Sequence, residues 1–352
     1  MRQRRRVLAS LALLTSASAA AFVLFELGVR LLEPQPETPY HFSPDTYFAP
    51  IPDADFVYRR QEFSIPVRFN HFGMRDRSRV LQKAPGTLRV ALLGDSFVEA
   101  LQVPDDSTLA RLLERELGAC LPGQAVEVLN FGVSGFGPVA SAAHYRGLAS
   151  RFVPDLVLYL FVGNDVMDLV TGPDARLYRV EDGKMVLQKV ELGRIRALRV
   201  RAVDWIKVRS HAYRFLRWRW MVWRDRGVMA AARARADSAA TSELLLAEED
   251  WQRAGQAFTL LQSLVDDAGA ELLVVAASTY GPEMDRRLAT LCASRDIALH
   301  DLMPALRADP GPVHFRIDGH WRARGHWVAS RSLSPVVCRL LQELELHQGS
   351  IR

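Results

Sequence analysis

Cysteine is scarce in this sequence, since only Cys120, Cys292 and Cys338 occur among 352 residues. So few cysteines exclude a disulfide scaffold, and an odd number prevents complete pairing. No two of them have metal-ligand spacing such as C-x-x-C. Collagen-like periodicity is also lacking. With 49% hydrophobic residues, the chain is too apolar for disorder and long enough for one large α/β domain with an insertion, or for two domains.

A uniform basic charge is lacking as well, although the net charge is +5. Arg2, Arg4, Arg5 and Arg6 carry four positive charges, and residues 194–236 carry a net charge of +11. The rest of the chain therefore has a net charge of −10. An acidic body with two basic segments is unlike a nucleic-acid binder. We expect no nucleic-acid partner.

The N-terminus has the composition of a membrane anchor. Val7 to Phe25 are uncharged and make a helix of about 28 Å, close to the ~30 Å hydrocarbon core of a bilayer. The preceding arginines favour a cytoplasmic N-terminus and an exported body. A cleaved signal peptide is the alternative, because Ala17-Ser18-Ala19 is a possible peptidase site. Apolar residues resume at Phe22, so we favour an uncleaved single-pass anchor, residues 1–32, with an exported body.

The rest of the chain is expected to have a linking segment and one main domain. Residues 33–87 are interpreted as a spacer and lead-in, because residues 33–52 contain six prolines, a composition typical of a stiff extended tether. The main domain is expected over residues 88–345. Within it, residues 171–250 form an insertion that fits no α/β repeat.

Apolar runs alternate with helical patterns in the main domain. Strands that alternate with helices indicate a parallel sheet covered on both faces. Ligands of such folds bind beyond the carboxyl ends of the strands. The expected strands are 89–93, 126–131, 155–162, 271–277 and 297–302; the expected helices are 109–117 (capped by residues 105–107), 261–268 and 286–295.

A serine with a candidate base follows the first strand. In Gly94-Asp95-Ser96, the glycine permits a tight turn and the Ser96 N–H can face a developing oxyanion. Serine needs a base, and His320 lies two residues after Asp318, so that in extended backbone both side chains project to the same side. Asp318 can then orient the imidazole that accepts the Ser96 proton. The alternative is a surface turn with an Asp–His hydrogen bond. His326, six residues later, is interpreted as a packing residue or as one that supports the base.

Two further loops at strand ends offer oxyanion donors. Gly135 has no side chain to block its N–H, and Asn164 offers an uncharged amide. Turn chemistry alone also accounts for Gly and Asn at such places. Ser134 is a rival nucleophile, but Phe136 replaces the last glycine of G-x-S-x-G, so an α/β-hydrolase elbow is not expected.

Taken together, these segments resemble the SGNH/GDSL hydrolase superfamily over residues 88–170 and 255–345. Its four blocks occur in order as Gly94-Asp95-Ser96, Gly135, Gly163-Asn164-Asp165 and Asp318-Gly319-His320. Asn70-His71-Phe72-Gly73-Met74-Arg75 also looks like the segment before the nucleophile in membrane-anchored bacterial members. The resemblance implies a flavodoxin-like, three-layer α/β/α fold with a five-stranded parallel sheet. It implies Ser96 as nucleophile, His320 as base, Asp318 as orienting carboxylate, and an oxyanion hole of Ser96 N–H, Gly135 N–H and the Asn164 amide.

Two features depart from many members of that superfamily. Only Gly319 separates the Asp from the His, and Arg322 stands where an Asn often follows. The D-x-H-W form is similar to that of alginate O-acetyltransferase-like proteins. The resemblance and the N-terminal anchor together lead us to expect a serine esterase anchored in a bacterial inner membrane, with a periplasmic body. It is expected to act on short acyl esters, above all acetyl esters, of a cell-envelope glycan without a metal or nucleotide cofactor. The alternatives are an O-acyltransferase that uses a polysaccharide hydroxyl and a non-catalytic glycan-binding protein.

The basic part of the insertion mixes arginine with tryptophan. Phe215, Trp218 and Val222 share one helical face, which predicts a helical cap that also carries Trp205, Trp220 and Trp223. Arginine stems that cover apolar surface are the simplest interpretation. The alternatives are that the segment contacts anionic lipid headgroups or that it binds an acidic polysaccharide. As a lid beside the strand ends, this segment would control which acyl acceptor enters.

Overall fold

A computed structural model describes residues 2–33, 35, 39–217, 219–220, 246–278 and 281–349. The chain forms two compact units: residues 1–38 with 193–237, and residues 39–192 with 238–352. Trp218, Val222 and Trp223 of the predicted cap lie outside the described residues.

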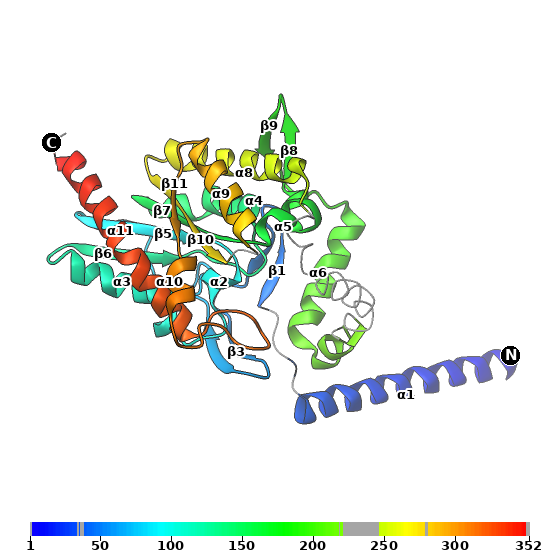
Figure 1. Cartoon of the computed structure of the whole chain (residues 1–352). Helices are drawn as coiled ribbons and strands as arrows, with labels where there is room; N and C mark the ends of the chain where they lie inside the picture. The colour runs from blue at the N-terminus through cyan, green and yellow to red at the C-terminus, as the bar shows by residue number, and fades with distance from the viewer. Residues whose placement is uncertain are drawn as a thin grey trace. The chain divides into compact units, whose positions relative to one another are not determined.

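The larger unit is built on a parallel sheet of five strands (Figure 1). The strands are β5 (Thr87–Leu93), β6 (Ala125–Asn130), β7 (Leu156–Val162), β10 (Glu271–Ser278) and β11 (Ala298–Asp301), in the order β11-β10-β7-β5-β6. Counted along the chain, this is the flavodoxin-like order 2-1-3-4-5. The predicted α/β fold is confirmed, and each predicted strand matches within two residues.

Helices bury both faces of this sheet. Successive strand side chains point to opposite faces, so Leu92 and Leu158 join one core cluster while Leu93 and Tyr159 join the other. Burial on both sides explains why the strands are unbroken apolar runs in the sequence. One face is covered by α3 (Leu109–Cys120), α10 (Met303–Ala308) and α11 (Ala323–Gly349), and the other by α4 (Pro138–Gly147), α8 (Glu248–Asp267) and α9 (Pro282–Ala293).

The start of α3 differs from the prediction. Asp105–Ser107 form a short 3-10 helix, η1, and do not cap α3. The N-cap is Thr108, whose hydroxyl accepts a hydrogen bond from the Arg111 N–H at 3.4 Å. The predicted cap was wrong because Thr108, in extended backbone directly before the helix, already supplies the oxygen that the first turn needs.

The segment expected as spacer and lead-in contains two hairpins, of which only the first lies in the residues expected as an extended tether, 33–52. The first pairs β1 (Tyr40–Ser43) with β2 (Tyr47–Pro50), and the second pairs β3 (Asp55–Arg59) with β4 (Ser64–Arg68). Their aromatic side chains find apolar partners: Phe48 packs on Phe136 of the main core, and Phe56 is only 4% exposed. This burial outweighs the extended preference of the prolines, so the spacer prediction was wrong for these residues.

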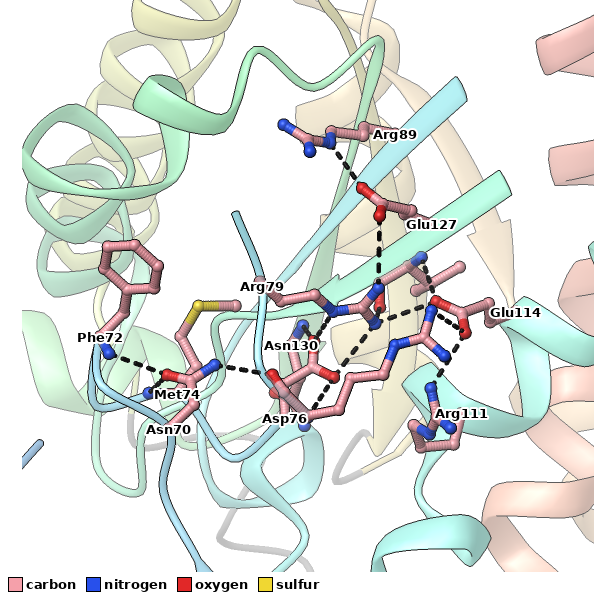
Figure 2. A network of polar contacts seen from close by, with 12 residues as sticks. Asn70, Phe72, Met74, Asp76, Arg79, Arg89, Arg111, Glu114, Glu127 and Asn130 are labelled. Atoms are coloured by element: carbon pink, nitrogen blue, oxygen red, sulfur yellow. Dashed lines mark hydrogen bonds and ion pairs between the residues drawn. The ribbon is translucent and has the colours of Figure 1, made fainter. Parts of the chain in front are cut away.

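A buried polar network joins the lead-in segment to the sheet (Figure 2). Arg79 forms ion pairs with Asp76 and with Glu114 of α3, both at 2.9 Å. Nearby, Arg89 of β5 donates to Glu127 of β6 at 2.6 Å. Buried charges are stable only when they are paired and hydrogen-bonded. The lead-in segment is therefore an integral part of the folded unit.

The first part of the insertion is also folded onto the larger unit. After β7 come α5 (Asp165–Thr171) and a 3-10 helix, η3 (Pro173–Arg176). A hairpin of β8 (Tyr178–Glu181) and β9 (Lys184–Leu187) follows, which the sequence did not predict.

Two of the three cysteines form a disulfide bond. Cys120 is the last residue of α3, and it bonds to Cys338 of α11, a helix that packs beside it. Cys292 remains a buried thiol, and burial raises its pKa to about 11. The two bonded cysteines are 218 residues apart in the sequence.

The smaller unit is helical in its described residues. Helix α1 (Arg2–Leu32) contains a stretch, Arg6–Leu32, that is long and apolar enough to cross a membrane, and none of its most apolar 18-residue window is buried. From the basic segment come α6 (Arg194–Arg209) and a helical turn over residues 211–217. The predicted helical character is confirmed for these residues.

Candidate active site

Ser96, His320 and Asp318 form one chain of hydrogen bonds. The Ser96 Oγ lies 2.7 Å from His320 Nε2, and His320 Nδ1 lies 2.6 Å from Asp318 Oδ1. Ser96 begins α2 (Ser96–Glu99) directly after β5, while the other two residues come from the loop before α11. All three are partly accessible to solvent. The structure thus brings together the nucleophile, base and orienting carboxylate that the sequence analysis singled out.

The turn before Ser96 requires glycine. Gly94 has φ +148°, and a Cβ atom there would lie 2.8 Å from Val98 Cγ2 and 3.1 Å from the Leu160 carbonyl oxygen. The next residue, Asp95, caps α2 by accepting the Phe97 N–H at 2.9 Å. Ser96 is therefore the first residue of a helix, where the backbone N–H has no partner within the helix. Its N–H is free to bind a negative charge.

The Asp–His pair meets for a different reason from the one predicted. The backbone is not extended here: Gly319 has φ +84°, in the left-handed region, and residues 316–318 form a turn. The Phe315 N–H donates to the His320 carbonyl at 2.8 Å and closes the loop. The loop therefore turns Asp318 back onto the imidazole, and the conformational freedom of glycine permits it.

Aromatic side chains pack against the imidazole of His320 and against its neighbour Trp321. The ring of Phe97 lies 5.0 Å from that of His320 and 5.1 Å from that of Trp321, which is fully buried. His326 packs edge-on against Trp321 at 5.4 Å, and burial lowers its pKa to about 3. His326 is thus a neutral packing residue, as predicted.

Glu62, which the sequence analysis missed, is hydrogen-bonded to the loop that carries Asp318. It lies between β3 and β4, and its carboxylate accepts the backbone N–H groups of Arg316, Ile317 and Asp318 at 2.8–2.9 Å. These bonds, first that of Asp318, lower the pKa of Glu62 below its usual range. Beside it, Phe63 packs on Phe315 at 5.0 Å. No local signal marks Glu62, because its partners lie more than 250 residues away.

Replacing Glu62 with alanine is expected to lower kcat for ester turnover by about tenfold to a hundredfold with little change in KM. The loop would lose its three-fold anchor, and small displacements of catalytic groups cost rate more than binding. Glu62→Gln, which keeps an acceptor oxygen, should lose less. Steady-state kinetics should be compared with Glu283→Ala, a carboxylate on α9. Equal kinetics in Glu62→Ala and Glu283→Ala would contradict the interpretation.

The two further oxyanion candidates follow the strands on either side of β5. Gly135 lies in the loop after β6 and has φ +84°, and Asn164 follows β7 at the start of α5. With Ser96 they occupy one edge of the sheet, where the strand order reverses and ligands of such folds bind. The Asn164 amide donates to Asp168 Oδ2 at 2.9 Å. Their role as oxyanion donors stays a prediction.

Glu99 of α2 fixes the loop that carries Gly135. Its buried carboxylate accepts the Tyr40 hydroxyl at 2.6 Å, the Ser134 N–H at 2.9 Å and also the Ser134 hydroxyl. Burial raises the pKa of Glu99. The partner of Ser134 is thus a carboxylate and not a histidine, which argues against Ser134 as the nucleophile.

The neighbours of Ser96 and Asn164 include buried carboxyl groups. Burial raises the pKa of Asp95 to about 6 and that of Asp168 above its usual value. Burial, followed by the charge of Asp95, raises the pKa of Asp165 further still. Tyr159 donates its hydroxyl to Asp165 at 2.8 Å. Within the described ranges, no group of three or more His, Cys, Asp or Glu has the arrangement of a metal site.

Asp174 of η3 holds the N-terminus of α4. It accepts the N–H groups of Val139 at 2.7 Å and Ala140 at 3.2 Å, and burial raises its pKa to about 7. Between about pH 4 and pH 7, the folded chain keeps a proton that the unfolded chain releases, so this group lowers stability as pH rises through that window.

We therefore expect Asp174→Asn to gain stability relative to the wild type as pH rises from about 5 to about 8, because the amide cannot ionise. Urea unfolding of both proteins at the two pH values measures the difference. If the two proteins differ in free energy of unfolding by the same amount at both pH values, the raised pKa of Asp174 is contradicted.

The solved structures named below resemble the chain only distantly. No family model matches the chain, and no curated protein sequence matches it. Among solved structures, TesA is 15% identical, with 70% of this chain and 98% of that chain covered at a TM-score of 0.40. The psychrotrophic esterase EstA from Pseudoalteromonas sp. is 11% identical, with 72% and 98% covered at 0.42. An alpha/beta hydrolase enzyme from the metagenome of Lake Arreo, Spain, is 13% identical, with 73% and 98% covered at 0.40.

Proposed function

We propose that this chain is a serine esterase of the SGNH type, anchored in a bacterial inner membrane, which removes short acyl groups from a cell-envelope glycan in the periplasm. One observation carries the proposal: Ser96 Oγ, His320 and Asp318 form a continuous relay with contacts of 2.7 and 2.6 Å at the carboxyl end of a parallel sheet. This is the geometry of nucleophile, base and orienting carboxylate in serine hydrolysis.

The proposed reaction has two steps. Ser96 Oγ attacks the ester carbonyl while His320 Nε2 takes its proton, and the tetrahedral oxyanion collapses to an acyl-serine as His320 returns the proton to the leaving alcohol. In the second step, His320 Nε2 takes a proton from water, which attacks the acyl carbon. The bond between that carbon and Ser96 Oγ then breaks, His320 returns the proton to Oγ, and the free acid leaves. Asp318 holds His320 Nδ1 throughout and stabilises the imidazolium. The N–H groups of Ser96 and Gly135 and the Asn164 amide are proposed to bind the oxyanion.

Export across the membrane is supported by two independent features. Arg2, Arg4, Arg5 and Arg6 precede the apolar residues of α1, as in a single-pass anchor with a cytoplasmic N-terminus. The Cys120–Cys338 disulfide belongs to the larger unit, and disulfide bonds persist in oxidising compartments such as the periplasm.

Acceptor dependence tests the proposed hydrolysis. The full chain is incubated with p-nitrophenyl acetate, with and without an unacetylated oligosaccharide, and free acetate and acetylated sugar are quantified. Hydrolysis predicts acetate at full rate without sugar. Acetylated sugar with little free acetate would instead establish the O-acyltransferase alternative, which uses the same acyl-serine. No turnover, together with glycan binding that survives Ser96→Ala, would establish a binding protein.

A further inference from the structure

Helix α6 of the smaller unit carries a stripe of exposed apolar side chains. Ile195, Leu198, Trp205 and Ile206 follow the spacing of one helical face and are 71%, 66%, 60% and 36% exposed. We call these four residues the apolar stripe. Val203 and Val208, 42% and 37% exposed, lie outside this face. No residue of α6 is buried. An exposed apolar surface of this kind marks a contact with a membrane or a partner.

Positive charge flanks the apolar stripe. The helix has six cationic residues and a single acidic one, Asp204, which pairs with Lys207 at 2.8 Å. The Arg209 guanidinium lies 4.9 Å above the Trp205 ring, so that the cation borders the apolar surface. Arginine, leucine and tryptophan side chains exposed on one helix offer both attraction to anionic lipid headgroups and apolar area for the membrane interface. The cationic residues are Arg194, Arg196, Arg199, Arg201, Lys207 and Arg209.

Contacts within the smaller unit fasten the end of α6 to α1. The Glu26 carboxylate of α1 accepts the N–H groups of His211 and Ala212 at 2.9 and 2.8 Å and the Ser210 hydroxyl at 2.7 Å. Arg30 donates to the Arg209 carbonyl at 2.5 Å. Glu26 thus caps the helical turn that follows α6, and this fixes where along α1 the basic helix is attached.

The place of attachment is the outer end of the apolar segment. Glu26 is the first charged residue after Val7–Phe25, whose nineteen residues match the hydrocarbon thickness of a bilayer. In a chain anchored by α1, Glu26 and Arg30 therefore lie at the level of the lipid headgroups. The C-terminal end of α6 is held at the same level.

We propose that α6 lies on the outer surface of the membrane, with the apolar stripe in the interface and its arginines on anionic phospholipid headgroups. The proposal rests on the proposed anchoring by α1. It adds a second, peripheral membrane contact that holds the basic segment against the bilayer on the side of the esterase unit.

Spin labels on three variants of the full chain, each with one added cysteine, test the proposal. Leu198→Cys places a label in the apolar stripe, and Arg196→Cys is the matched control on the opposite side of α6. Leu14→Cys reports whether α1 itself is inserted. The native cysteines stay unlabelled, because Cys120 and Cys338 are bonded and Cys292 is buried. Each variant is placed in vesicles of phosphatidylcholine with or without phosphatidylglycerol, and its accessibility to oxygen and to a water-soluble nickel chelate is measured.

The expected result in phosphatidylglycerol vesicles is an inversion between the two α6 labels: oxygen access exceeds nickel access at position 198 and falls below it at position 196. Removing phosphatidylglycerol should shift position 198 towards nickel access. Nickel-dominated access at both positions, with a lipid-exposed label at position 14, would overturn the proposal and leave anchoring intact. An aqueous label at position 14 would overturn the anchoring itself. Shielding of position 198 from both reagents would assign the stripe to a protein or glycan contact instead.

Discussion

Replacing Ser96 with alanine is expected to abolish ester turnover, with a loss in kcat of about 10⁴-fold or more, because members of a serine relay act as a unit. Alanine removes the atom that forms the acyl bond, while His320 and Asp318 keep their 2.6 Å contact. The measurement is kcat on p-nitrophenyl acetate for the two full-length proteins. A mass shift of one acetyl group on the wild type, absent from the variant, would identify the acyl-serine.

Ser134→Ala provides the matched control for that experiment. Its hydroxyl binds Glu99, and the alanine variant still donates the backbone N–H at position 134 to the same carboxylate. We expect it to retain most of the activity. Equal turnover in Ser96→Ala and wild type would eliminate Ser96 as the nucleophile, and loss confined to Ser134→Ala would transfer that role to Ser134.

Loss of the Cys120–Cys338 disulfide should have the largest effect on stability. The bond closes a loop of more than 200 residues. In the chain-entropy account, such a crosslink lowers the conformational entropy of the unfolded chain and so raises its free energy by about 5 kcal/mol. The double variant Cys120→Ala/Cys338→Ala is therefore expected to unfold at clearly lower urea concentration than the wild type.

A reductant provides the control for the disulfide. It should lower the unfolding midpoint of the wild type towards that of the double variant and leave the double variant unchanged, because Cys292 has no bond to lose. A wild type whose midpoint does not respond to full reduction would contradict the assigned contribution.

The sheet was predictable because its strands are buried on both faces. Thr87–Leu93 and Leu156–Val162 are buried at every position, so that each forms an unbroken apolar run. The hairpins of residues 40–68 were missed because their strands are short and proline is frequent around them. What fixes these hairpins is packing such as that of Phe48 on Phe136, which lies far along the chain and leaves no local pattern.

The hydrogen-bonded group of Ser96, His320 and Asp318 was also predictable, but the contacts that support it were not. Ser96 follows a strand, and Asp318 stands close to His320 in sequence, so the pairing could be found locally. The reason given for it was incorrect, since a left-handed Gly319 and not an extended backbone joins the two. Glu62 reaches the same loop from a hairpin that the sequence did not reveal. Likewise, the number and spacing of the cysteines gave no indication that two of them lie on adjacent helices.

The separation of the relay along the chain sets the order in which the enzyme can become active. Ser96 and His320 are 224 residues apart, and β10, which lies between β7 and β11 in the sheet, is formed from residues 271–278. A chain that emerges from its N-terminus exposes the serine early but has neither a complete sheet nor a base until residue 320 has followed. Such long-range pairings also form late in folding. The proposed ester cleavage therefore requires nearly the whole chain to have reached one compartment, and a chain truncated before position 320 is expected to be inert.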